Sequence, residues 1–408
     1  MSLADAFDSF RSLPVDVPRL VETILSEARA AGASDIHLVP TADGLEMKWR
    51  LDGVLQRVCE FPRAAGPQVI ARLKVLADLL TYRTEIPQEG RIRPWRDDEN
   101  TERLPTAGSD TETRLSTFPT LFGEKAVIRL FVGAGRYRRL NELGLPPDVE
   151  RELGQRLGET DGVILLTGPA GGGKTTTAYA ALREIIRTSE GRRSVVTLED
   201  PIEVVVPGAD QTQVNPNAGL NLATGLKSVL RQDPDMLLVG EIRDRETAET
   251  VFQASLTGHL VVTTFHAGSA ARSIGRLLDM DIEPYLLRSG LLVVLCQRLV
   301  RQLCECAEES HDPADRLGLP VETVRRPVGC EDCRSTGYAG RFVVTEFLDP
   351  ERHGVGGKMT ARVDSRTLET IAEAHGLQSL RESGLNAVRD GRTSPAEFIR
   401  VFGSKETR

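Results

Sequence analysis

The sequence has few aromatic residues, no excess of basic charge and no long apolar run. Aromatic residues make up 5% of its 408 residues, and the formal net charge is −8. Binding of nucleic acid through a basic, aromatic-rich surface is therefore not expected. No apolar stretch reaches the roughly 18 residues that a membrane-spanning helix needs. Residues 1–14 lack a basic region followed by an apolar core, so we expect no secretory signal and predict a cytoplasmic protein.

Cysteine is also scarce, and its placement is uneven. Of the six cysteines, Cys59 and Cys296 have apolar neighbours and are expected to be buried small side chains. The other four form two close pairs, and in a reducing compartment such clustering indicates metal binding before a disulfide. These four candidate metal ligands are Cys304, Cys306, Cys330 and Cys333.

The spacing within the two cysteine pairs differs. Cys330-x-x-Cys333 has the spacing of zinc ligands, whereas Cys304-x-Cys306 is one residue shorter. Four thiolates can still surround zinc tetrahedrally, and His311 is an alternative to one of them. The sequence thus leaves two possibilities open: a structural zinc site and a metal-free cysteine cluster.

The first part of the chain has the pattern of a small α/β domain. Apolar residues recur at helical spacing over 17–31, and alternating strand patterns follow on either side of a predicted Asp52-Gly53 turn. We predict another helix near 66–80 and a return to strand over 113–131. The polar, turn-rich segment 94–113 is expected to be a loop.

Strands and helices alternate after a linker predicted at 133–147, where the pattern changes. This alternation predicts a parallel sheet covered by helices on both faces, with ligands bound at the carboxyl ends of its strands. The predicted strands are 162–168, 194–200, 236–241 and 260–267.

A phosphate-binding loop is predicted between the strand 162–168 and the helix that follows. The segment 168–175 fits the pattern G-x-x-x-x-G-K-[ST], in which backbone amides and the lysine hold phosphate and the hydroxyl group faces magnesium. The alternative, a glycine-rich turn with a chance lysine, is disfavoured by the strand before it and the helix after it. The predicted nucleotide and magnesium ligands are Gly168, Pro169, Ala170, Gly171, Gly172, Gly173, Lys174, Thr175 and Thr176.

Acidic residues and histidines flank three other strands of the predicted sheet. Glutamate can orient or deprotonate water, and histidine can contact the γ-phosphate. Taken singly, each has a simpler explanation as a solvated carboxylate or a structural histidine, but their repetition along one sheet favours nucleotide hydrolysis. The residues are Glu199, Asp200, Glu203, Glu241, His259 and His266.

These motifs together resemble the hexameric ATPases of type II secretion and of type IV pilus assembly and retraction. The Walker A motif, aspartate box, Walker B motif and histidine box of that family are matched, in order, by 168–177, 198–203, 230–244 and 257–267. "SDIH" and "PQEGR" resemble its N-terminal PAS-like domain, and "GCEDCRSTGYAGRF" resembles its C-terminal metal module.

The resemblance implies an α/β fold with two main domains. A PAS-like domain would precede a RecA-like P-loop ATPase domain, which carries a small zinc-binding module and a helical tail. The implied boundaries are 1–15 for an N-terminal extension, 16–132 for the PAS-like domain, 133–147 for the linker, 148–300 for the ATPase domain, 301–347 for the cysteine module and 348–408 for the helical region.

The resemblance also assigns catalytic roles. Glu203 matches the glutamate that activates water, Glu241 the Walker B glutamate that supports magnesium, and His266 the histidine that reports on the γ-phosphate. Arg114 and Arg129 match arginines that the N-terminal domain contributes to the nucleotide. The alternative for both arginines is an ordinary pair on the strand surface. Arg91 is a further, less specific candidate.

The implied function is an ATP-hydrolysing motor with ATP, Mg²⁺ and structural Zn²⁺. It would form a hexamer at the inner face of the cytoplasmic membrane, act on a membrane platform protein, and power pilin or pseudopilin assembly or type II secretion. The cysteine module favours assembly over retraction motors. The alternatives are a retraction motor, a nucleic-acid translocase on the same core, and a nucleotide-sensing scaffold without turnover.

Overall fold

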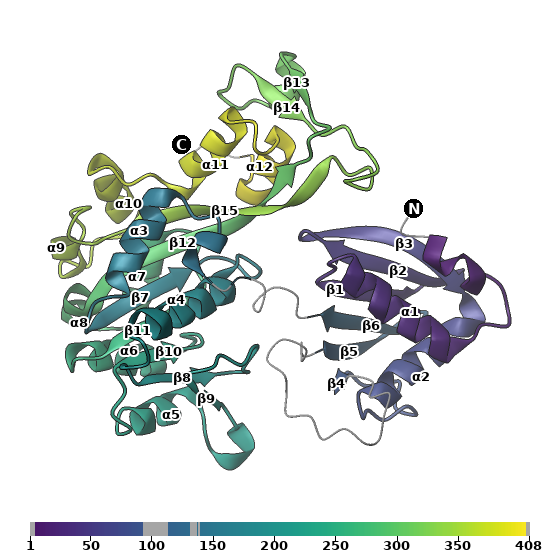
Figure 1. Ribbon diagram of the computed structural model, residues 1–408, viewed down its shortest axis with the longest axis horizontal. Coiled ribbons are helices and arrows are strands. Elements are labelled where there is room, and N and C mark those ends of the chain that lie inside the picture. Colours follow the sequence, from purple (N-terminus) through teal and green to yellow (C-terminus); the bar gives the residue numbers. More distant parts are fainter. Residues whose placement is uncertain (1–4, 93–112, 131–136, 138, 405–408) are drawn as a thin grey trace. The chain divides into compact units, whose positions relative to one another are not determined.

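The chain divides into two compact units, residues 1–136 and 137–408, and each is described by itself. The computed structural model describes residues 5–92, 113–130, 137 and 139–404 (Figure 1). The loop predicted over 94–113 therefore lies outside the described residues except for Thr113. Residues 133–136 and 138 of the predicted linker also lie outside them.

The first unit is a six-stranded antiparallel sheet with the strand order β3-β2-β1-β6-β5-β4. The short helix η1 (Asp5–Phe10) precedes the helices α1 (Val17–Ala30) and α2 (Gly66–Leu76), which confirm the two helices predicted here. The strands are β1 (Asp35–Pro40), β2 (Gly44–Leu51), β3 (Val54–Pro62), β4 (Gln88–Ile92), β5 (Thr113–Thr120) and β6 (Gly123–Leu130).

Helix α1 shows how the first unit obtains its core. The side chain of Asp16 caps the helix by accepting the backbone N–H of Arg19 at 3.2 Å. The apolar residues that recur at helical spacing are all buried, and they pack with strand residues such as Trp49 in a single core. These helix residues are Val17, Leu20, Val21, Ile24, Leu25 and Ala28.

The second unit contains a seven-stranded sheet with the order β15-β12-β7-β11-β10-β8-β9. All neighbouring strands are parallel except β15, which runs antiparallel to β12. The carboxyl ends of the parallel strands therefore share one edge, as predicted. The strands are β7 (Gly162–Thr167), β8 (Val195–Glu199), β9 (Asp210–Gln213), β10 (Met236–Val239), β11 (Leu260–Phe265), β12 (Leu291–Leu303) and β15 (Tyr338–Leu348).

Helices cover this sheet, and every residue of β7, β8, β10 and β11 is buried. None of the described helices is long and apolar enough to cross a lipid bilayer. The helices are α3 (Pro147–Arg156), α4 (Lys174–Thr188), α5 (Leu222–Val229), α6 (Arg245–Leu256), α7 (Ala270–Asp279), α8 (Pro284–Gly290), α9 (Gly356–Met359), α10 (Ser365–Ala374), α11 (Leu380–Arg389) and α12 (Pro395–Phe402).

A small two-stranded sheet and a group of C-terminal helices complete the second unit. The two-stranded sheet of β13 (Glu308–Ser310) and β14 (Val324–Arg326) lies between β12 and β15 in the sequence, beyond the end of that long strand pair in Figure 1. Helices α10 to α12 lie within 348–408, the region for which the sequence predicts helices.

One buried carboxylate ties the C-terminal helices to the sheet. Glu346 of β15 accepts the backbone N–H of Ala270 at 2.7 Å and that of Leu380 at 2.9 Å. It thus caps the first residues of α7 and α11 together.

Candidate functional site

The loop predicted to bind phosphate connects β7 to α4, and the lysine of the motif reaches back into it. Lys174 Nζ donates to the backbone oxygens of Gly168 and Pro169, both at 2.9 Å. Gly171 and Gly173 have φ angles of 72° and 90°, in the left-handed region that favours glycine. The glycine pattern therefore sets the turn, and the lysine ammonium group lies where the loop would enclose a phosphate group.

Gln297 of β12 holds the loop by a hydrogen bond, and this residue is not among those predicted from the sequence. Its Nε2 atom donates to the backbone oxygen of Gly172 at 2.9 Å, and its side chain is 1% exposed. A Cβ atom at Gly168 would lie 2.3 Å from the Gln297 backbone oxygen, so glycine is required there by close packing as well. The sequence signal is that Gln297 is the first polar residue after the apolar run 291–296 of β12.

His266 and Glu241 extend from Lys174 as a chain of polar contacts. His266 Nδ1 lies 3.4 Å from Lys174 Nζ, and His266 Nε2 lies 3.1 Å from Glu241 Oε1. Burial lowers the pKa of Lys174, and the nearby Glu241 carboxylate opposes that shift. Three residues from three predicted motifs therefore come together at the carboxyl edge of the sheet.

Arg243 extends this series of polar contacts to the aspartate box, residues 198–203. Its Nε atom lies 3.2 Å from Glu241 Oε2, and its Nη1 atom lies 3.1 Å from Asp200 Oδ2. Arg243 is not among the residues predicted from the sequence, although it stands two residues after Glu241 in the same motif. The contact depends on β8 and β10 being neighbours in the sheet.

The remaining residues of the aspartate and histidine boxes have different surroundings. Glu203 lies in the half-buried segment after β8, whereas Glu199 is 4% exposed and accepts three hydrogen bonds from side chains. His259 precedes β11 and so lies at the amino edge of the sheet, opposite to His266. There its Nδ1 atom is 3.1 Å from the Ala254 backbone oxygen.

The candidate arginines belong to the first unit, where they occupy one row across the sheet. Arg91 is paired with Arg114, Arg114 with Arg129, and Arg129 with Asp35 in the strand registers. Directly paired residues in antiparallel strands share a face, so these side chains are neighbours. Arg129 Nε lies 3.1 Å from Asp35 Oδ1, and Arg50 Nε lies 3.4 Å from Asp35 Oδ2.

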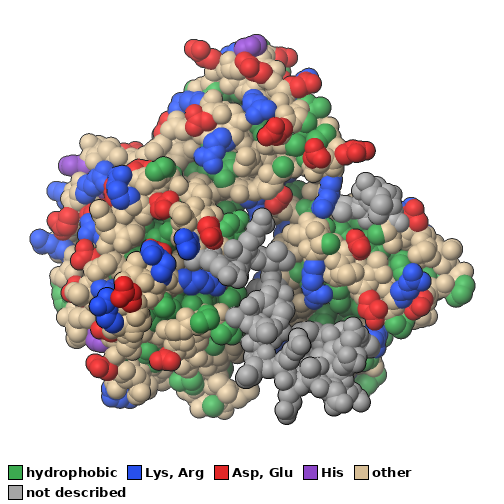
Figure 2. All heavy atoms as spheres, viewed as in Figure 1, with side chains coloured by type: hydrophobic (Ala, Val, Ile, Leu, Met, Phe, Trp, Pro, Cys, Tyr) green, Lys and Arg blue, Asp and Glu red, His purple; other side chains and the backbone are tan. Residues whose placement is uncertain are grey.

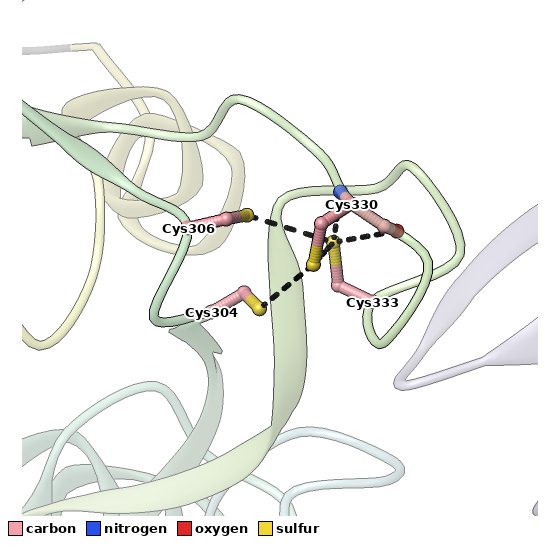
Figure 3. Close-up of side chains that lie close together, drawn as sticks. All are labelled: Cys304, Cys306, Cys330 and Cys333. Carbon is pink, nitrogen blue, oxygen red and sulfur yellow. Dashed lines mark hydrogen bonds between the residues drawn. The ribbon is translucent and has the colours of Figure 1, made fainter.

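The four clustered cysteines are brought together at the end of β12, as Figure 3 shows. The Sγ atoms of Cys304 and Cys330 are 3.8 Å apart, as are those of Cys306 and Cys333, and those of Cys330 and Cys333 are 3.7 Å apart. Zinc–thiolate bonds of about 2.3 Å in a tetrahedron require sulfur–sulfur distances of about 3.8 Å. Three of the six sulfur–sulfur distances have this value, and all four Sγ atoms lie within 4.8 Å of one another, so the cluster could hold a metal ion despite the shortened first pair.

Hydrogen bonds favour the thiolate form of one of these cysteines. Burial raises the pKa of Cys333, but the backbone N–H groups of Cys330 and Gly337 donate to its Sγ atom and lower the pKa to about 6. His311, the alternative ligand, instead contacts Glu309 at 3.5 Å and Thr323 at 3.3 Å. Among the described residues the candidate ligand set is four cysteines without this histidine.

A family model described as "Type II/IV secretion system protein" matches residues 14–400. The chain belongs to this family. The resemblance to the type II secretion and type IV pilus assembly ATPases, and the enzyme class that it carries, are thereby confirmed.

Two relatives illustrate the match. The chain is 39% identical over 396 residues to type II secretion system protein E of Aeromonas hydrophila, covering 94% of this chain and 75% of the relative. It is 38% identical over 394 residues to the type IV pilus assembly ATPase PilB of Thermus thermophilus, covering 93% of this chain. The chain spans 42% of the length of this second relative.

Solved structures confirm a mixed α/β fold of the ATPase type for this member of the family. The ATPase DotB of Legionella pneumophila has a TM-score of 0.67 at 19% identity, with 95% of this chain and 96% of that chain covered. The pilus retraction motor PilT with bound ADP has a TM-score of 0.61 at 23% identity, with 94% and 96% covered.

Proposed function

We propose that this chain is an ATP-hydrolysing motor that powers pilin or pseudopilin assembly, or type II protein secretion. The observation that carries the proposal is the contact chain Lys174–His266–Glu241, with distances of 3.4 and 3.1 Å, around a phosphate-binding loop. Lysine, histidine and carboxylate groups gathered at the carboxyl edge of one sheet are suited to holding a triphosphate and to responding when the γ-phosphate leaves.

The phosphate-binding loop and Glu241 would hold the nucleotide and its metal ion. Lys174 would exchange its contacts with the Gly168 and Pro169 oxygens for phosphate oxygens. Thr175, at the start of α4, and Glu241 have oxygen atoms of the kind that magnesium prefers. The bound magnesium ion would neutralise charge on the β- and γ-phosphates.

Glu203 would activate the attacking water, because it follows β8 at the carboxyl edge of the sheet and matches the aspartate-box glutamate to which the resemblance assigns this role. Glu199 is buried and accepts three side-chain hydrogen bonds, and Asp200 and Glu241 are both paired with Arg243. Proton transfer by a positioned carboxylate typically contributes about 100-fold or more to a rate.

The first unit would complete the site with arginines. In this proposal residues 16–132 form the PAS-like domain, and residues 148–300 form the RecA-like domain. Arg114 and Arg129 would add positive charge to the phosphates, and the Asp35–Arg129 pair supports a defined orientation for the second of them. Closure and reopening of such domains around nucleotide would convert hydrolysis into rigid-body motion.

The assembly and location of the motor are part of the same proposal. The chain would form a hexamer and act on a platform protein at the inner face of the cytoplasmic membrane. The relatives that are named for secretion and pilus assembly support this role. Nucleic acid is not an expected partner, since the formal net charge is −8, and basic and acidic side chains are interspersed on the one face that Figure 2 shows.

A structural zinc ion in the cysteine module is the second cofactor that we propose. Cys304, Cys306, Cys330 and Cys333 would hold it in a closed, four-coordinate site of the structural type. Such a site would fix the loops between β12 and β15 and would take no part in hydrolysis.

The test of the proposed chemistry is ATP hydrolysis by the full chain and two variants. Lys174→Ala should abolish nucleotide binding, whereas Glu203→Gln should bind ATP normally and hydrolyse it at least about 100-fold more slowly. Glu190→Gln, at a surface pair with Arg192, is the control and should be fully active. Full activity of Glu203→Gln would refute the assigned role of Glu203, and hydrolysis that rises with added DNA would favour a translocase.

A further inference from the structure

Tyr179 connects the phosphate-binding helix to the aspartate box through its hydroxyl group. The residue lies in the second turn of α4, and its side chain is fully buried. The hydroxyl group donates to Oε2 of Glu199 and accepts the backbone N–H groups of Glu203 at 3.0 Å and Val204 at 3.4 Å. One oxygen atom therefore holds both the start and the end of the segment 199–204 against the helix that begins at Lys174.

Glu199 is held in place as the hydrogen-bond acceptor of the Tyr179 hydroxyl group. Its Oε1 atom accepts from Thr197 Oγ1 at 2.6 Å and from Gln211 Nε2 at 3.1 Å, while its Oε2 atom accepts from Tyr179. A buried carboxylate with three donors has little capacity left for a water molecule. Its position orients the Tyr179 hydroxyl group so that the lone pairs of that oxygen face Glu203 and Val204.

Gln211 of β9 also holds this segment through hydrogen bonds to its backbone. Its Nε2 atom also lies 3.0 Å from the Val204 backbone oxygen, and its Oε1 atom accepts the Val206 N–H at 2.6 Å. Tyr179 and Gln211 thus restrain consecutive peptide groups of an irregular segment. Such restraint is what a catalytic group on a loop requires to remain in position.

The protonation state of Tyr179 agrees with its role as a donor. Burial raises the pKa of Tyr179, and the Glu199 carboxylate raises it further. The phenol group therefore keeps its proton at physiological pH, and the hydrogen bond to Glu199 persists.

We propose that Tyr179 is a positioning residue for ATP hydrolysis, whose hydroxyl group fixes the backbone of Glu203 relative to the phosphate-binding loop. The inference rests on the proposed role of Glu203 in activating water. Because Tyr179 and Lys174 belong to one helix, a displacement of that helix when nucleotide binds or leaves would be transmitted to Glu203.

The test is Tyr179→Phe, which keeps the ring and removes the hydroxyl group. We expect kcat to fall at least about tenfold while the KM for ATP and the affinity for an ATP analogue change less than about twofold, because misplacing a catalytic group slows chemistry without removing phosphate contacts. Tyr338→Phe is the matched control, since it also removes a buried hydroxyl group, one that lies 2.6 Å from Ser394 Oγ. It should retain wild-type kcat.

A second measurement separates positioning from general damage. If Tyr179 acts through Glu203, adding Tyr179→Phe to Glu203→Gln should change the single-turnover rate by less than about twofold, whereas independent effects would multiply. Wild-type kcat in Tyr179→Phe, an equal loss in Tyr338→Phe, or multiplied effects in the double variant would each overturn the inference.

The outcomes also distinguish this inference from the proposed function. An inactive Glu203→Gln beside a fully active Tyr179→Phe would overturn the inference alone. A fully active Glu203→Gln would overturn the role assigned to Glu203 and the inference with it.

Discussion

His266 Nε2 lies 3.1 Å from Glu241 Oε1, and this contact links the histidine box to the Walker B motif. The other ring nitrogen of His266 faces Lys174 Nζ at 3.4 Å, so one imidazole connects the carboxylate to the lysine of the phosphate-binding loop. A change at the phosphates that moves Lys174 would therefore reach Glu241 through His266.

Replacement of Glu241 by glutamine should impair turnover more than nucleotide binding. The variant keeps the side-chain shape but loses a charge that is close to Lys174, His266 and Arg243. A hydrogen bond to a charged group contributes about 1.5–3 kcal/mol, so we expect kcat to fall about 10- to 100-fold with little change in ATP affinity. Steady-state hydrolysis and analogue binding would measure both.

Glu246→Gln is the control for that experiment, because Glu246 pairs with Lys227 on the surface. It should show wild-type kinetics. If Glu241→Gln hydrolyses ATP at the wild-type rate, the proposed support of magnesium by Glu241 is wrong.

Asp35→Asn should slow hydrolysis modestly if Arg129 acts on the nucleotide. Asp35 holds the Arg129 guanidinium group at 3.1 Å, and the asparagine would hold it less firmly. Because the Arg129 side chain is 64% exposed, the pair is worth at most about 1 kcal/mol, which corresponds to a loss in kcat of up to about fivefold. Glu60→Gln, which removes a partner of Arg57 in the same sheet, should have no effect on kcat.

The cysteine module should contain about one zinc ion per chain. Elemental analysis of protein purified without chelator would measure it, and a content below about half an equivalent would contradict the four-thiolate site. Cys333→Ser should lower the zinc content and the melting temperature. Cys296→Ala, at a buried cysteine outside the cluster, should lower the melting temperature and leave zinc unchanged.

Glu346 should make the stability of the second unit depend on pH. Burial raises the pKa of this carboxyl group from its ordinary value of 4.5 to about 7, although the N–H groups of Leu380 and Ala270 oppose the shift. Below pH 4.5 the group is protonated in both states. As pH rises from 4.5 to about 7, ionisation favours the unfolded chain, so stability is lost across this window.

The variant Glu346→Gln removes that ionisation. Thermal unfolding of Glu346→Gln should therefore show a smaller decrease in melting temperature between pH 5 and pH 8 than that of the wild type, whatever its absolute stability. Identical pH profiles would show that Glu346 does not titrate in this range. Glu382→Gln, at an exposed pair with Arg389 in α11, should keep the wild-type profile.

Much of the candidate site was predictable because its signals are local. The glycines of the loop 168–173 are needed for backbone angles and close approach, and Glu203, Glu241 and His266 all lie within four residues of the end of a parallel strand. Since the carboxyl ends of parallel strands meet at one edge, strand recognition predicts that Glu241 and His266 lie at the same edge of the sheet. Their contact depends in addition on β10 and β11 being neighbours.

Other features depend on which strands are neighbours, and periodicity does not encode that. Arg243 reaches Asp200 because β10 lies beside β8, and Gln297 reaches the phosphate-binding loop because β12 pairs with β7. His259 and His266 belong to one motif but lie at opposite edges of the sheet, because β11 separates them.

The sequence by itself determined the family, the alternation of strands and helices, and the position of the glycine-rich loop that we propose binds phosphate, since each depends on residue type and short-range spacing. The tertiary structure decided that four cysteines with a shortened pair still gather within 4.8 Å of one another, that His311 is not among them, and that Tyr179 connects α4 to Glu203. These relationships join residues far apart in the chain, and the distances that define them arise from packing.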